Sequence, residues 1–92
     1  MSFNLLYAES YLKRAKRFAK QHPELKEQYR KTLMLLEKNP HHPSLRLHSL
    51  QGKLSGLHSI SINVSYRLTI ELMISDNAIT LVNVGTHQDV YR

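Results

Sequence analysis

The spacing of apolar residues changes along the chain, from a helical period in the first half to an alternating period in the second. In the first half, residues 9–20 carry one apolar face at a period of 3.6, which predicts an amphipathic helix. A second apolar stripe predicts another helix that begins near Pro23 and ends at Asn39-Pro40. The link between them is short, so the two helices are expected to pack as a hairpin.

The second half predicts strands. Apolar and polar residues alternate over 59–65 and again over 66–72, the pattern of half-buried strands. Residues 79–84 are almost entirely apolar, as in a strand covered on both sides. Ser75-Asp76-Asn77 is a turn signal, so the strands around it should form a hairpin.

Short apolar segments at 3–7 and 45–50 predict two further strands. The order β-α-α-β-β-β indicates an α+β fold in which the helix hairpin packs on a mostly antiparallel sheet of four or five strands. The 92 residues suit one domain, 1–92.

The alternation also divides side chains between the two faces of the sheet. If Leu68 faces the helices, Arg67 and Thr69 point to the opposite face. Ser59 and Ser61 are expected on that same face. The sequence therefore predicts a polar, basic sheet face that could hold RNA.

The charge of the chain indicates polyanionic partners. Thirteen Lys and Arg against seven Asp and Glu give a formal net charge of +6 and a pI near 9.8. The first helix carries a basic cluster, which suits either a solvated face or docking to RNA or an acidic protein. There are no cysteines, no signal-peptide pattern and no apolar run of membrane-spanning length, so a cytoplasmic protein without membrane contact is expected.

Three short segments concentrate groups able to act on a phosphodiester. They are 48–56 with His48 and Lys53, 65–67 with Arg67, and 85–92 with His87. Imidazoles can transfer protons and a guanidinium can stabilise a pentavalent phosphorane. The adjacent pair His41-His42 lacks a third ligand at suitable spacing, so no metal or other cofactor is predicted.

These segments carry a resemblance to a known family. The element order, His48-x-Leu-x-Gly52-x-x-x-Gly56, the strand that begins Tyr66-Arg67, and the ending Val84-Gly85-Thr86-His87-x-x-Val90-Tyr91 resemble the RelE/ParE toxin superfamily, in particular the YafQ-like branch of RelE-type toxins. The resemblance implies a RelE-like fold and the toxin of a type II toxin–antitoxin system. It implies a ribosome-dependent mRNA endoribonuclease, in which the ribose 2′-OH attacks the adjacent phosphate without a metal.

The resemblance assigns catalytic roles by position. His48 and His87 match the histidines that transfer protons, and Arg67 matches the arginine that stabilises the transition state. Tyr91 lies where the family uses an aromatic residue, and it would orient the phosphate, donate a proton or stack on a base.

Four further residues are predicted to contact the substrate: Lys53, Tyr66, Ser61 and Ser65. Ser61 and Ser65 also mark a departure, because YafQ-like enzymes have a histidine and an aspartate there. Two alternatives therefore stay open. One is a ParE-like inhibitor of DNA gyrase, and the other is a catalytically decayed toxin that acts only as antitoxin partner and co-repressor.

The implied partners follow from the same resemblance. They are an acidic, partly disordered antitoxin encoded nearby, and the ribosome with its mRNA. Operator DNA would be contacted only through the antitoxin.

Overall fold

Residues 2–86 and 88, which the computed structural model describes, follow the order β-α-α-β-β-β-β, which has one strand more after the helices than the predicted order. The chain begins with β1 (Asn4–Tyr7) and α1 (Glu9–Gln21). A single 3-10 turn, Pro23–Leu25, leads to α2 (Lys26–Lys38). The remaining strands are β2 (His48–Ser49), β3 (His58–Ser61), β4 (Tyr66–Met73) and β5 (Ala78–Thr86).

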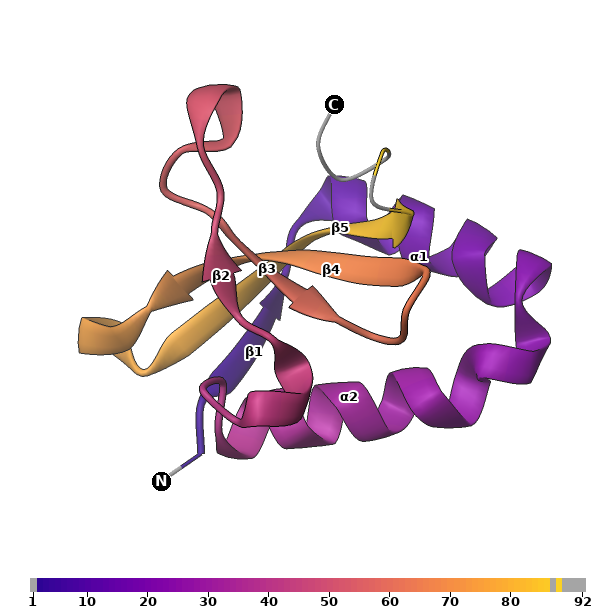
Figure 1. Cartoon of the computed structure of the whole chain (residues 1–92), viewed down its shortest axis with the longest axis horizontal. Helices are drawn as coiled ribbons and strands as arrows, with labels where there is room; N and C mark the ends of the chain where they lie inside the picture. Colours follow the sequence, from indigo (N-terminus) through magenta and orange to yellow (C-terminus); the bar gives the residue numbers. More distant parts are fainter. Residues whose placement is uncertain (1, 87, 89–92) are drawn as a thin grey trace.

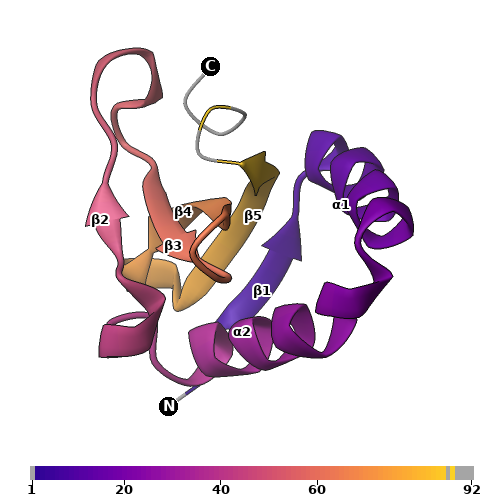
Figure 2. The same ribbon diagram turned by 45° about the vertical axis from the view of Figure 1, so that its right-hand side comes forward.

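The five described strands form one sheet in the order β1-β5-β4-β3-β2. β1 pairs with β5 in parallel, and the other neighbours are antiparallel (Figure 1). The last pair between β1 and β5 is Tyr7 with Leu81, so residues 82–86 extend beyond β1. Helix α1 lies alongside the last residues of β5, whereas α2 runs beside the start of β1 (Figure 2).

The core lies between the helices and one face of the sheet. Phe18 of α1 and Leu36 of α2 are buried against strand residues that include Leu68, Ile70 and Ile79. The predicted α+β fold, with two helices on a mostly antiparallel sheet, is confirmed. Leu68 does face the helices, which places Arg67 and Thr69 on the opposite face.

Two predicted strands are shorter than their apolar patterns suggest. β3 ends at Ser61, and Val64 is 97% exposed in the following turn. That turn is stabilised by Asn63, whose side-chain oxygen accepts hydrogen bonds from the backbone N–H groups of Ser65 at 2.9 Å and Tyr66 at 2.8 Å. Between Pro43 and Leu50 only His48–Ser49 is a strand, because Arg46 adopts a left-handed backbone with φ of 51°.

The prediction of an open polar sheet face is wrong at its centre. Ser59 and Thr69 are 0% and 1% exposed, and their hydroxyls have no hydrogen-bond partner among the described residues. Alternation determines which face a side chain takes, but it does not determine whether another part of the chain covers that face. Arg67 and Ser61, one row further along, are only half-buried.

A pair of tyrosines links the two helices. The hydroxyls of Tyr11 on α1 and Tyr29 on α2 are joined by a short hydrogen bond. Burial raises the pKa of both phenols above the ordinary value of 10.0, so both are protonated at neutral pH. A phenol whose pKa is raised on folding contributes stability that is present below pH 10.0 and is lost as the pH rises further.

We expect Tyr29→Phe to lower the free energy of unfolding by about 1 kcal/mol at neutral pH, because it leaves the Tyr11 hydroxyl without its partner. The variant should also lose less stability than the parent protein as the pH rises above 10.0. Urea unfolding at neutral and alkaline pH measures both effects. Tyr7→Phe is the control, since Tyr7 is 52% exposed; equal losses in the two variants would contradict the prediction.

Candidate functional site

Strand register places His48 and Arg67 on the same face of the sheet. His48 of β2 pairs with Ser59 of β3, and Ser59 pairs with Thr69 of β4, so these three side chains form one row. Ser61 and Arg67 pair in the next row of that face. Rows two residues apart along a strand are separated by about 7 Å. The two groups therefore lie on the same face, away from the helices, with β3 between their strands.

The ring of His48 has a defined orientation. Its Nδ1 lies 3.1 Å from the carbonyl oxygen of Arg46. A carbonyl only accepts hydrogen bonds, so Nδ1 is the donor. In the neutral imidazole the other nitrogen, Nε2, then lacks a proton and has the form required of a general base. The side chain is exposed, at the outer strand of the sheet.

Arg67 lies in β4 between two small residues. It pairs with Ser61 on one side and Gly85 on the other. Gly85 has no side chain, so the arginine stem is not crowded from β5. A half-buried guanidinium in this position can present its donors to a phosphate bound on the face.

The other predicted substrate contacts are more dispersed. The Ser61 hydroxyl donates to the backbone oxygen of Asn63 at 2.7 Å, and Ser65 is exposed in the same turn. Lys53 is exposed in the 3-10 turn Gly52–Leu54, within the loop between β2 and β3 that projects beyond the sheet (Figure 1). Strand alternation turns Tyr66 to the helix face. The predicted catalytic residues His87 and Tyr91 lie outside the described residues.

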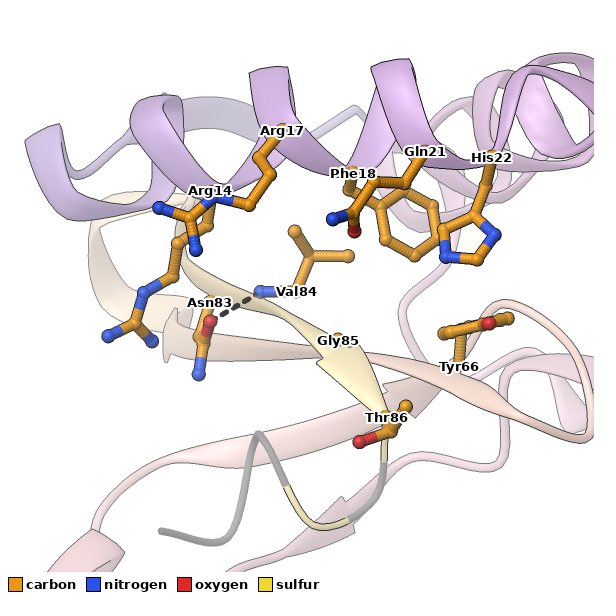
Figure 3. Close-up of a pocket in the computed structure, with 10 residues that line it drawn as sticks. All are labelled: Arg14, Arg17, Phe18, Gln21, His22, Tyr66, Asn83, Val84, Gly85 and Thr86. Atoms are coloured by element: carbon orange, nitrogen blue, oxygen red, sulfur yellow. Dashed lines mark hydrogen bonds between the residues drawn. The ribbon is translucent and has the colours of Figure 1, made fainter.

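A cleft that the sequence analysis did not identify lies between α1 and the end of β5. Its volume is about 450 Å³. Residues 83–86 of β5 form one wall, and Tyr66 closes one end. In Figure 3 Arg14 and Arg17 extend from α1 towards β5, with His22 and Tyr66 at the opposite end of the cleft.

Aromatic contacts stabilise the end of the cleft that Tyr66 closes. The ring centroid of Tyr66 lies 5.1 Å from that of Phe18 and 4.6 Å from that of His22. Phe18 and His22 are themselves 4.8 Å apart. A helical face that joins Phe18 to Arg14, Arg17 and Gln21 was readable from the i, i+3, i+4, i+7 spacing, but the sequence could not show what faces it.

The described residues hold no group of three or more His, Asp or Glu side chains arranged to bind a metal ion. Within the same part of the chain, neither helix has the length and apolar content needed to cross a membrane.

Comparison with known proteins gives matches in structure alone. No family model matches the sequence, and no curated protein matches it either. YafQ from E. coli strain BL21(DE3) superposes with a TM-score of 0.80 and 18% identity, over 98% of this chain and 99% of that one. A chain of the E. coli DinJ-YafQ toxin–antitoxin complex gives a TM-score of 0.78 and 20% identity, over 100% of both chains.

A third similar structure is the YoeB/ParE toxin from Agrobacterium tumefaciens, with a TM-score of 0.76 and 14% identity over 92% of this chain and 99% of that one. At these identities the likeness establishes the fold. The chain therefore has the fold that YafQ shares with the YoeB/ParE toxin.

Proposed function

We propose that this protein is the toxin of a type II toxin–antitoxin system and that it cleaves mRNA on the ribosome. The observation that carries the proposal is the register that places His48 and Arg67 on one sheet face of a YafQ-like fold. A gyrase inhibitor has no need of an oriented imidazole and a guanidinium on one sheet face. The net charge of +6 supports a nucleic-acid target.

The proposed reaction needs no metal. His48 takes the proton of the ribose 2′-OH, whose oxygen then attacks the adjacent phosphorus. Arg67 binds the non-bridging oxygens and stabilises the negative charge of the phosphorane. The P–O5′ bond breaks, and the leaving oxygen takes a proton from His87, assisted by Tyr91. Cleavage leaves a 2′,3′-cyclic phosphate and a 5′-hydroxyl.

An acidic antitoxin is the proposed protein partner. The DinJ-YafQ complex is a toxin–antitoxin complex of a protein with this fold. A basic chain with net charge +6 suits an acidic, partly disordered partner. Contact with operator DNA would then be made through the antitoxin.

We expect the purified protein to cut mRNA on translating ribosomes and to cleave naked RNA slowly or not at all. In-line geometry of the 2′-OH and phosphate accounts for a large part of the barrier, and the ribosome would impose it on the mRNA. Primer extension on mRNA, with and without ribosomes, measures this difference.

A gyrase supercoiling assay run in parallel distinguishes the alternatives. Loss of supercoiling with intact mRNA would support a ParE-like inhibitor instead. Rapid cleavage of free RNA would contradict the ribosome requirement. A protein that is inactive in both assays but binds an antitoxin would fit a decayed toxin.

A further inference from the structure

We infer that the cleft between α1 and the end of β5 is a binding subsite for an RNA backbone phosphate, next to the catalytic face. The inference rests on the proposed function, since RNA is the substrate named there. It adds a second contact surface, built from Arg14, Arg17 and the end of β5, on the side of the sheet away from His48.

The charge of the cleft favours an anion. Arg14 and Arg17 are exposed, and neither forms an ion pair within the described part of the chain. Among the described residues, no carboxylate lines the cleft; Glu9 lines an adjoining hollow with both arginines. Two guanidiniums can together grip a phosphate through several parallel donors.

The cleft adjoins the proposed catalytic face through consecutive residues of β4. Tyr66 turns its ring into the cleft, and the next residue, Arg67, points to the opposite face. Their partners across the strand pair are Thr86 and Gly85, which both line the cleft. An RNA strand that passes over this end of the sheet can therefore contact both surfaces.

The geometry favours RNA over a peptide. Within the described part of the chain, β5 has no strand neighbour beyond Leu81 on its β1 side, and such an open edge can accept an added peptide strand. However, the Val84 N–H already donates to the Asn83 side-chain oxygen at 2.8 Å, which removes a donor that a peptide strand would use. A groove more suited to apolar peptide side chains lies on the other side of α1, lined by residues such as Ala15, Ala19 and Leu33.

The test measures binding of a short 2′-O-methyl RNA, which cannot be cleaved because it lacks the nucleophile. Fluorescence anisotropy is recorded over a range of salt concentrations for the full chain and for Arg14→Ala/Arg17→Ala. Each lost phosphate contact lowers the slope of log K against log salt by about 0.7. Both arginines grip the same phosphate, so the double variant should lose about 0.7 and bind several-fold more weakly.

Lys16→Ala/Lys20→Ala is the matched control. It removes the same charge from the same helix, from residues that line the groove and not the cleft. Equal losses of RNA affinity in the two variants would overturn the inference, because the arginines would then contribute only to the overall positive potential of the protein. All four residues are exposed, and thermal melting checks that the fold is kept.

Two competitors separate RNA from other anions. Inorganic phosphate is titrated while the amide signals of Val84 and Gly85 are followed by NMR. If these signals shift but the arginine variant binds RNA as tightly as the parent protein, the cleft is a site for free phosphate and the inference is overturned. Arginine-dependent binding of polyglutamate without RNA binding would favour a protein partner and overturn it too. The readout is binding, so absent mRNA cleavage with intact RNA binding would refute the proposed enzyme and leave the subsite standing.

Discussion

Replacing His48 with alanine is expected to lower the rate of ribosome-dependent mRNA cleavage by about 10²–10⁴-fold. The hydrogen bond from Nδ1 to the Arg46 carbonyl leaves Nε2 as the basic nitrogen, on the same face as Arg67. The side chain is exposed at the outer strand, so its removal leaves no cavity. Single-turnover cleavage on programmed ribosomes, beside thermal melting, measures both quantities.

His41→Ala is the control for this variant. It also removes one exposed imidazole, but from the turn after α2 and outside the sheet. Cleavage by His48→Ala at the parent rate would remove His48 from the mechanism. The same assay on His87→Ala tests the second predicted proton-transfer group.

Arg67→Ala should reduce cleavage by about 10²–10³-fold with little change in melting temperature, because it removes one donor to the transition-state charge. Arg67 is half-buried on the face away from the helices and contributes no volume to the main core. The assay is again single-turnover cleavage, and Arg67→Lys shows whether charge alone suffices.

Arg30→Ala provides the comparison for a lost arginine. Arg30 is exposed on α2, where it pairs with Glu27 at 2.6 Å, and solvent screens such surface pairs so that they contribute little to stability. If Arg67→Ala instead melts far below Arg30→Ala, Arg67 holds the fold and the catalytic assignment fails.

The sequence predicted the fold well because apolar periodicity is a local property that survives folding. The helix pattern over 9–20 became α1, and the alternation over 66–72 became β4. Local patterns were less reliable where a side chain competed for backbone hydrogen bonds. Asn63 ended β3 early and left Val64 exposed, although Val64 fits the alternation.

The candidate site was likewise predictable from the sequence only in part. The sequence alone identified His48 and Arg67 as candidate groups and predicted that Arg67 lies on the face away from the helices. It could not show that β2 pairs with β3 in the register that brings His48 onto that face, because register depends on contacts between distant segments.

The sequence by itself determined the α+β class, the faces of β4 and the basic charge of the chain, since each follows from residue type and spacing. Only the tertiary structure decided that Ser59 and Thr69 are buried and that Arg14 and Arg17 face the end of β5 across a cleft. Burial and clefts arise where elements far apart in sequence meet. No local period of apolar residues encodes which elements those are.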